Sequence, residues 1–172
     1  MLATAPVEEG GGPEKPLVLV VDDSDLTRKM LCRIMKAQGY DYEEAEDGHV
    51  AVEKVRQNMR RADGRTYAVI LMDFVMPVMD GPTATRSIRE LGFTAPVLGV
   101  TGNGQDFDIA KFVESGANKV FTKPLDVQGF RAYMKAVSDK AETVRSRAPS
   151  QHESVADGAD GLGVTIAIND IV

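Results

Sequence analysis

Short runs of consecutive apolar residues alternate along the chain with longer stretches in which apolar residues recur every three or four positions. Such runs, bounded by polar or turn residues, are typical of strands that are buried on both faces of a parallel sheet. The periodic stretches between them predict amphipathic helices. The predicted strands cover residues 17–21, 40–45, 68–72, 96–100 and 119–122, of which 40–45 has the weakest pattern.

The predicted helices follow these strands one by one. Asp25 and Asp47 are suitable N-caps for the first and second helix, and Gly39 is expected to end the first. The last helix is expected from Val127 to about Arg147. The residues that we expect to face inward are Leu26, Met30, Leu31, Ile34 and Met35, then Val52, Val55 and Met59, then Ala84, Ile88 and Leu91, then Ile109, Ala110 and Val113, and finally Phe130, Tyr133, Met134 and Val137.

Five strand–helix units in succession predict a doubly wound α/β fold, with a five-stranded parallel sheet and helices on both of its faces. A strand order of 2-1-3-4-5 is expected, because it sets the first and third strands side by side at the topological switch point. We expect a domain over residues 17–140, a flexible N-terminal segment over 1–16, and a disordered tail after the end of the last helix within 141–172. An alternating apolar pattern in 164–168 leaves two alternatives for the tail, an added strand or a terminal carboxylate that binds in a groove.

The length and composition of the chain are compatible with this fold. Its 172 residues, 43% of them hydrophobic, suffice for one core and are too few for two large domains. No apolar stretch reaches the ~20 residues that span a bilayer, and residues 1–16 lack the pattern of a signal peptide. We therefore expect a soluble cytoplasmic protein without membrane contact. The net charge of -6 lies in the two terminal segments, and the middle part has no basic stripe, so we expect no direct binding of nucleic acid.

Polar residues directly follow four of the predicted strands. Asp22 and Asp23 follow the first strand, Asp73 the third, Thr101 the fourth and Lys123 the fifth. Ligands of open parallel sheets bind outside the carboxyl ends of the strands. We therefore expect these side chains to form one site.

Three neighbouring carboxylates repel one another, and a hard divalent cation such as Mg²⁺ removes that conflict. Mg²⁺ usually shares phosphate oxygens with a substrate, and phosphoryl transfer needs positioning and charge neutralisation more than covalent chemistry. The Lys123 ammonium and the Thr101 hydroxyl are suited to that task. Asp73 is the candidate nucleophile, since it stands singly and precedes a loop shaped by Pro77 and Gly81.

Several short motifs occur together and in a fixed order along the chain. They are Asp22-Asp23, Asp73, Met76-Pro77, Asp80-Gly81, Thr101-Gly102, Gly116-Ala117 and Lys123-Pro124. In this combination they resemble the receiver domain of two-component response regulators and hybrid histidine kinases. The resemblance covers about residues 16–138 and implies a flavodoxin-like receiver fold.

The resemblance also implies the roles of the acidic residues. Asp73 would be the phosphoacceptor. Asp23, Asp73 and the main-chain carbonyl of Val75 would ligate Mg²⁺, and Asp22 would act on the ion mostly through a bound water.

By the same resemblance, Thr101 would be the switch hydroxyl and Lys123 would contact the phosphoryl oxygens. The donor would be a phosphohistidine on a histidine kinase or a histidine phosphotransfer protein. We expect a signalling switch that catalyses its own Mg²⁺-dependent phosphorylation and dephosphorylation, not an enzyme that acts on other substrates. Val75 and Asn103 are expected to influence the lifetime of the phosphoryl group, and the bond before Pro124 is expected to be cis.

The chain departs from the family pattern three residues before Lys123. The family usually has Phe or Tyr there, whereas this chain has Val120, and its aromatic residue, Phe121, comes next. Alternation along a strand would turn Phe121 to the opposite face. The alternative function is therefore a degenerate receiver that acts as a constitutive protein-docking module.

Two other functions fit the chain less well. A flavin-binding module needs a phosphate-binding loop after the first strand, where Asp22 and Asp23 would repel a phosphate. A phosphatase of the haloacid dehalogenase type needs a second acid two residues after its nucleophile, where this chain has Val75.

Overall fold

The structure is a computed structural model that describes residues 14–102 and 104–147. The expectations for residues 1–13, for the tail 148–172 and for Asn103 therefore lie outside the described residues. Within the described part of the chain, no helix is both long and apolar enough to cross a membrane.

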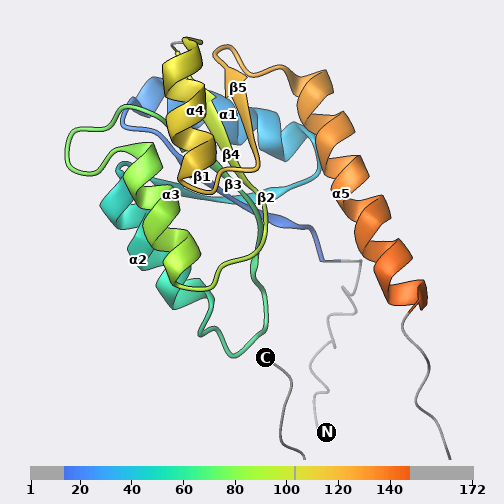
Figure 1. Ribbon diagram of the computed structural model, residues 1–172. Helices are drawn as coiled ribbons and strands as arrows, with labels where there is room; N and C mark the ends of the chain where they lie inside the picture. Colours follow the sequence, from blue (N-terminus) through green and yellow to red (C-terminus); the bar gives the residue numbers. More distant parts are fainter. Residues whose placement is uncertain (1–13, 103, 148–172) are drawn as a thin grey trace, which may run out of the picture. The chain divides into compact units, whose positions relative to one another are not determined.

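Strand and helix alternate along the described chain, as predicted. The elements are β1 Leu17–Val21, α1 Asp25–Ala37, β2 Asp41–Ala45, α2 Gly48–Asn58, β3 Tyr67–Asp73, α3 Gly81–Glu90, β4 Val97–Thr101, α4 Asp106–Glu114, β5 Lys119–Thr122 and α5 Val127–Arg147. Neighbouring strands are parallel, and their order in the sheet is β2-β1-β3-β4-β5 (Figure 1). The predicted fold class and strand order are thus confirmed.

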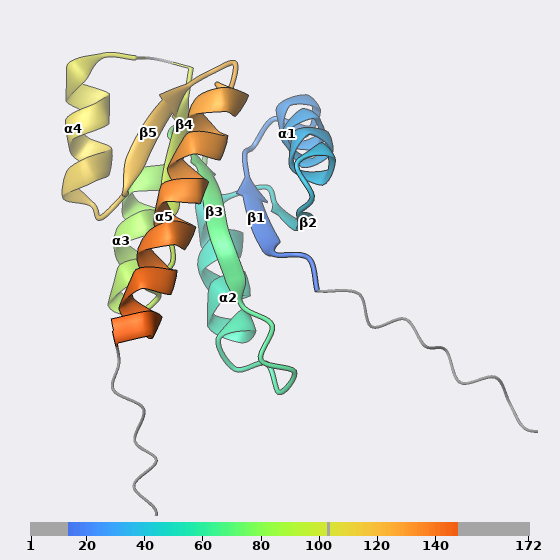
Figure 2. The same cartoon turned by 90° about the vertical axis from the view of Figure 1, so that its right-hand side faces the viewer.

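The chain divides into two compact units, Met1–Tyr133 and Met134–Val172, with the boundary inside α5. The sheet, the helices α1 to α4 and every predicted site residue belong to the first unit. Within that unit, α2 and α3 lie on one face of the sheet and α1 lies on the other (Figures 1 and 2).

Alternation along β1 explains how one strand serves both faces. Leu17, Leu19 and Val21 belong to a buried cluster that includes Val55 of α2 and Ile88 of α3. The intervening residues of β1 are equally buried and point to the side of α1. A strand buried on both faces reads as the uninterrupted apolar run that the sequence shows.

The inner face of α1 differs in part from the predicted one. Leu31 and Met35 are buried as expected, together with Cys32, but Leu26 is 82% exposed and Met30 is 43% exposed. Two rows of apolar residues spaced four apart run along this helix, and only the row that meets the sheet is buried. The pattern alone did not distinguish the two rows.

The helix ends follow local capping chemistry. The N-cap of α1 is Ser24, whose hydroxyl accepts a hydrogen bond from the Thr27 N–H, so the prediction of Asp25 as N-cap was wrong by one residue. Asp47 caps α2, as predicted. Gly39 follows the end of α1 with a φ of 86°, a left-handed conformation that favours glycine.

In the other helices, the residues predicted to face inward divide into buried and half-buried ones, apart from the exposed Met59, Ala110 and Val113. The buried ones are Val52, Val55, Ala84, Ile88 and Phe130, and the half-buried ones are Leu91, Ile109, Tyr133, Met134 and Val137. Met59 is 42% exposed, contrary to the prediction, because α2 ends at its C-cap there.

The inner face of α4 was predicted wrongly. Ala110 and Val113 were expected inside, but both are exposed and Phe112 is completely buried. The space for its ring comes from Gly99 in β4, where a Cβ would lie 2.8 Å from ring carbons of Phe112. The Phe112 ring also packs edge-on against Phe74, with 5.3 Å between ring centroids. A long-range partner, invisible in the helical pattern, therefore selects the buried face.

The predicted alternation in β5 is confirmed. Val120 packs against the buried cluster that contains Phe112. Phe121 is buried on the opposite face, where a Cβ on Gly129 would lie 3.3 Å from its ring. The aromatic side chain of this strand thus does not lie on the side of α4.

Candidate functional site

Three aspartates meet at the carboxyl edge of the sheet. Asp22 follows β1 and Asp73 ends β3, and these strands are direct neighbours with Val21 paired to Met72. One carboxylate oxygen from each of Asp22, Asp23 and Asp73 lies within 4.8 Å of the other two. Asp22 and Asp73 are buried, whereas Asp23 is exposed. Two of the three carboxylates are therefore buried at the end of the sheet, and the cluster is open to solvent on the side of Asp23.

Local hydrogen bonds orient the two buried carboxylates. Asp22 Oδ1 accepts from the Ser24 N–H at 2.9 Å, and the Arg28 guanidinium donates to the Asp22 carbonyl at 2.8 Å. Asp73 Oδ1 accepts from the Phe74 N–H at 2.8 Å. Each carboxylate keeps a second oxygen for other partners.

Lys123 joins these two aspartates. Its Nζ lies 2.6 Å from Asp22 Oδ2 and 2.9 Å from Asp73 Oδ1. Its backbone N–H donates to the Thr101 carbonyl at 2.7 Å, which continues the pairing of β4 and β5 beyond the strand ends. The Lys123–Pro124 bond is cis, as expected.

The charges of the site leave an excess of two negative charges, since Lys123 offsets one of the three carboxylates. Burial raises the pKa of Asp73 above its ordinary value, and the Asp22 charge adds to this, although Lys123 acts in the opposite sense. Burial lowers the pKa of Lys123, but its hydrogen bonds to Asp22 and Asp73 outweigh that effect and raise it. The all-oxygen donor set and the net charge fit a hard divalent cation.

The raised pKa of Asp73 predicts a pH dependence of stability. Between the ordinary pKa of 3.8 and the raised one, the folded protein binds more protons than the unfolded chain, so its stability falls as the pH rises through that window. The Asp73→Asn variant has no carboxyl group at this position, so it does not lose stability in this way. Without divalent cations, the melting temperature of Asp73→Asn relative to the wild type is expected to increase with pH in this window and then level off. Thermal melts in EDTA from about pH 3 to 8 test it, and a constant difference would contradict it.

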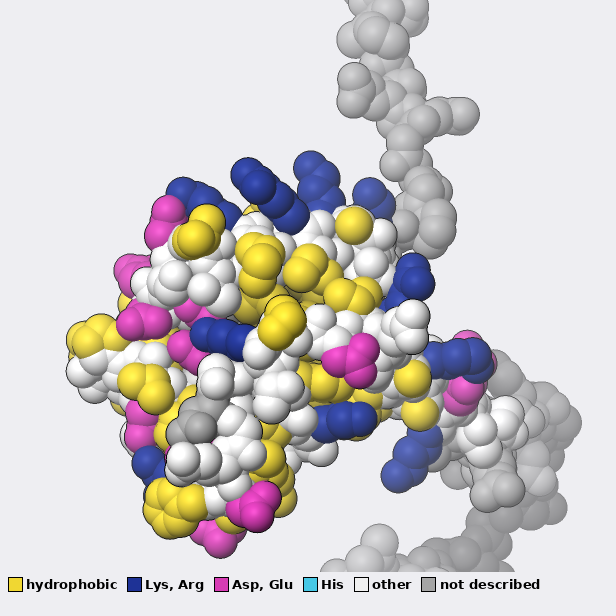
Figure 3. Space-filling view, turned by 90° about the horizontal axis from the view of Figure 1, so that it is seen from above, with side chains coloured by type: hydrophobic (Ala, Val, Ile, Leu, Met, Phe, Trp, Pro, Cys, Tyr) yellow, Lys and Arg dark blue, Asp and Glu magenta, His cyan; other side chains and the backbone are white. Residues whose placement is uncertain are grey.

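Thr101 is the last residue of β4 and is almost completely buried. The register pairs Asp73 with Val100, so Thr101 lies one residue beyond the level of Asp73 on the adjacent strand. All five predicted side-chain positions thus lie at the same edge of the sheet. Figure 3 looks onto this end of the molecule, where exposed hydrophobic side chains lie between acidic and basic ones.

A link between α4 and the loop after Asp73 was missed by sequence reasoning. Lys111 Nζ lies 3.0 Å from Asp80 Oδ2 and 5.5 Å from the centre of the Phe74 ring. Both contacts join residues about thirty positions apart or more, and no local pattern marks them. Val75, predicted to offer its carbonyl, lies within this loop with its side chain 70% exposed.

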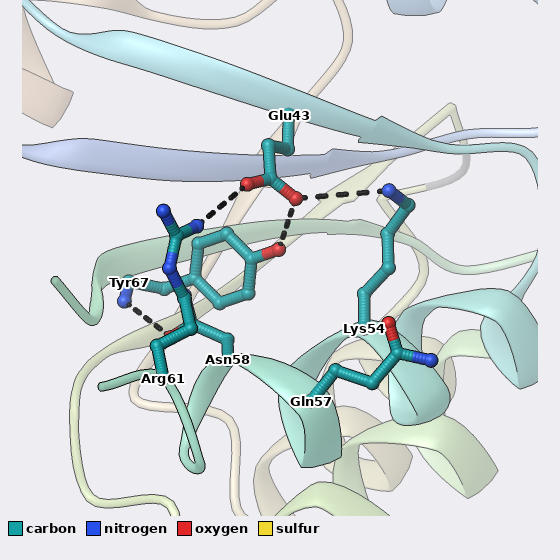
Figure 4. Close-up of a pocket in the computed structure, with 6 residues that line it drawn as sticks. All are labelled: Glu43, Lys54, Gln57, Asn58, Arg61 and Tyr67. Atoms are coloured by element: carbon teal, nitrogen blue, oxygen red, sulfur yellow. Dashed lines mark hydrogen bonds and ion pairs between the residues drawn. The ribbon is translucent and has the colours of Figure 1, made fainter. Parts of the chain in front are cut away.

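A separate pocket of about 260 Å³ lies away from the acidic site (Figure 4). Tyr67 begins β3, so this pocket is at the opposite end of the strand from Asp73. The Glu43 carboxylate accepts from the Tyr67 hydroxyl at 2.6 Å and pairs with Arg61 at 3.2 Å. The polar groups of the pocket thus largely satisfy one another, and it is the weaker candidate for a functional site. Its lining residues are Glu43, Lys54, Gln57, Asn58, Arg61 and Tyr67.

A doubly wound parallel sheet that gathers three aspartates and a lysine at its carboxyl edge is the arrangement that the motifs of a receiver domain led us to expect. A family model described as response regulator receiver domain matches residues 18–135. The chain therefore belongs to the response regulator receiver domain family, as the motifs indicated.

Relatives with similar sequences include both short and long proteins. The chain is 40% identical over 110 residues to the two-component response regulator ORR41 of Oryza sativa subsp. japonica, covering 63% of this chain and 83% of that protein. It is 34% identical over 122 residues to the sensor protein EvgS of Escherichia coli K12, covering 71% of this chain but only 10% of EvgS. The likeness to the long sensor proteins is thus confined to one domain of each.

Solved structures show the same fold. The chemotaxis protein CheY4 of Vibrio cholerae has a TM-score of 0.61 at 26% identity, covering 72% of this chain and 98% of that one. A chain of the CheX-CheY-BeF3-Mg+2 complex from Borrelia burgdorferi has a TM-score of 0.58 at 28% identity, covering 76% of this chain and 89% of that one.

Proposed function

We propose that this protein accepts a phosphoryl group on Asp73 from a phosphohistidine of a histidine kinase or a histidine phosphotransfer protein, and that phosphorylation switches its binding to partners. The observation that carries the proposal is the position of Lys123, whose ammonium contacts both Asp22 and Asp73 inside the three-aspartate cluster. The sequence likeness to a two-component response regulator and a sensor protein supports it.

In this proposal, Mg²⁺ is held by Asp23, Asp73 and the Val75 carbonyl, with Asp22 acting mostly through a water. Mg²⁺ favours oxygen ligands and keeps several waters, which suits two buried carboxylates beside an exposed one. When bound, the ion supplies charge neutralisation for the phosphoryl oxygens. The related Borrelia burgdorferi complex contains BeF3 and Mg²⁺, which supports this choice of ion.

The proposed reaction is an in-line displacement at phosphorus. A carboxylate oxygen of Asp73 forms a bond to phosphorus while the phosphorus–nitrogen bond of the phosphohistidine breaks. The imidazole leaves with the electron pair and takes a proton from solvent. The Lys123 ammonium, 2.9 Å from Asp73 Oδ1, would neutralise charge on one phosphoryl oxygen. The Thr101 hydroxyl would donate a hydrogen bond to another. Water later hydrolyses the acyl phosphate and regenerates Asp73.

Exposed apolar side chains around the site support a role in partner binding. Leu26, Val75, Val78 and Phe107 are between 70% and 82% exposed. They lie on the segments that directly follow β1, β3 and β4, at the end of the sheet that carries the aspartates. Exposed apolar side chains gathered at one end of a protein are typical of a protein–protein contact.

The second candidate function is a constitutive docking module, favoured by Val120 and by the burial of Phe121 on the opposite face. The two functions are separated by incubation of the protein with Mg²⁺ and phosphoramidate, followed by measurement of the intact mass. The proposed function predicts the gain of one phosphoryl group. The absence of any mass gain would favour the docking module.

Mg²⁺ is expected to raise the melting temperature of the wild-type protein, because a ligand that binds only the folded state stabilises it. At a concentration of 100 times Kd the gain is about 2.7 kcal/mol. Asp23→Asn is expected to lose most of this gain while its own melting temperature without Mg²⁺ changes little, because Asp23 is exposed. Glu90→Gln, an exposed change on α3, is the control and should keep the full Mg²⁺ effect. Equal Mg²⁺ shifts in both variants would exclude Asp23 as a ligand.

A further inference from the structure

Asp47 contacts both α2 and the loop after the phosphoacceptor. Its side chain is almost completely buried, with 6% exposure. Asp47 Oδ1 accepts from the His49 N–H at 2.9 Å and so caps α2. Asp47 Oδ2 accepts from the N–H groups of Val78 and Met79 at 3.0 and 3.3 Å. One carboxylate thus caps a helix and holds a loop more than thirty residues away.

The loop that Asp47 holds carries the proposed metal ligand. Val75, whose carbonyl would bind Mg²⁺, is 70% exposed, so side-chain packing does not hold this residue in place. Its neighbours Phe74 and Met76 are buried and anchor the first half of the loop. In the second half, Val78 is 80% exposed and only Met79 packs against the buried cluster, so backbone hydrogen bonds also hold this half. Two of these bonds go to Asp47.

Close backbone packing surrounds the contact. A Cβ on Gly48 would lie 2.5 Å from the Met79 carbonyl oxygen, so α2 begins directly against the loop. At the end of the loop, the Gly81 N–H donates to the Phe74 carbonyl at 2.9 Å and closes the loop on itself. The loop is therefore fixed at its base by Gly81 and on its outer side by Asp47.

We propose that Asp47 is a positioning residue for the metal site: by binding the Val78 and Met79 N–H groups, it keeps the Val75 carbonyl in the place that metal binding requires. The proposal rests on the proposed function, which makes that carbonyl a ligand. Hydrogen bonds to a buried carboxylate are stronger than those between neutral groups. Removing a residue that orients a metal ligand without touching the metal typically weakens metal binding by about 10- to 100-fold.

Asp47→Ser separates the two roles of this side chain. Serine is as good an N-cap as aspartate, so the bond to the His49 N–H is kept. Its single hydroxyl oxygen replaces only one of the two carboxylate oxygens, so the bonds to Val78 and Met79 are lost. Amide hydrogen exchange followed by NMR, without metal or phosphodonor, is expected to become faster at Val78 and Met79 and to stay unchanged at His49. Binding of Mn²⁺, a hard cation used as the probe, is expected to weaken by about tenfold.

Ile88→Val is the control for loss of stability alone, since Ile88 is fully buried in α3 and its side chain cannot form a hydrogen bond to the loop. It is expected to lower the melting temperature without faster exchange at Val78 and Met79 and without weaker Mn²⁺ binding. The role of Asp47 is refuted if Asp47→Ser leaves Mn²⁺ affinity unchanged, if Ile88→Val weakens it equally, or if the wild type does not bind Mn²⁺. If the wild type takes up no phosphoryl group but Asp47→Ser still shows both effects, the proposed function is contradicted and the role of Asp47 is supported.

Discussion

Asp73→Asn is expected to gain no phosphoryl group from phosphoramidate in the presence of Mg²⁺, under conditions in which the wild type gains one. An amide oxygen is a much weaker nucleophile than a carboxylate, and the change also removes a proposed metal ligand. The proposed function makes Asp73 the acceptor, and its carboxylate lies 2.9 Å from the Lys123 ammonium. Intact-mass measurement over time gives the result directly.

Two outcomes would contradict this prediction. Uptake by Asp73→Asn at the wild-type rate would show that another residue is the acceptor. A wild type without uptake would leave the docking module as the better function. Glu90→Gln, on the exposed side of α3, should behave as the wild type and controls for handling. The expected stability of Asp73→Asn at neutral pH makes loss of uptake through unfolding easy to exclude by a melting curve.

Phe112→Ala is expected to lower the free energy of unfolding by about 3–5 kcal/mol, the usual cost of truncating a buried aromatic residue. Phe112 is completely buried, and its ring fills the space over Gly99 and packs against Phe74. Gly99 has no side chain, and the rigid ring of Phe74 cannot change shape, so neither fills the cavity left behind. Urea denaturation gives the change in free energy of unfolding.

Phe107→Ala provides the matched control on the same helix. Phe107 is 75% exposed, so its truncation should change the free energy of unfolding by no more than about 0.5 kcal/mol. A similar loss in both variants would mean that Phe112 does not hold α4 against the sheet. The contact joins α4 to Phe74, the residue directly after the proposed phosphoacceptor.

The sheet and its strand order were predictable from the sequence because they depend on strong local patterns. β1 and β3 are buried on both faces, so each shows as an unbroken apolar run. Strand-helix alternation then restricts the topology to parallel, right-handed crossovers. With β1 next to β3, the meeting of Asp22 and Asp73 follows directly.

Side-chain faces were less predictable wherever two local patterns were equally good. In α1 the periodicity admitted both the row of Leu31 and the row of Leu26, and the position of the sheet buried only the first. In α4 the buried residue is Phe112, because Gly99, on another element, makes room for it. Neither choice is contained in the helical repeat itself.

In the candidate site, too, some features follow from local sequence and others from the packing of distant segments. The sequence alone determined the identity of the acidic residues, Thr101 and Lys123, and their position at the ends of strands, since strand and helix periods are properties of a local segment. Only the tertiary structure decided that Lys123 bridges Asp22 and Asp73 and that Asp47 accepts hydrogen bonds from the loop after Asp73. The physical reason is that hydrogen bonds and ion pairs between distant segments depend on how folded elements pack, and a one-dimensional pattern does not contain that packing.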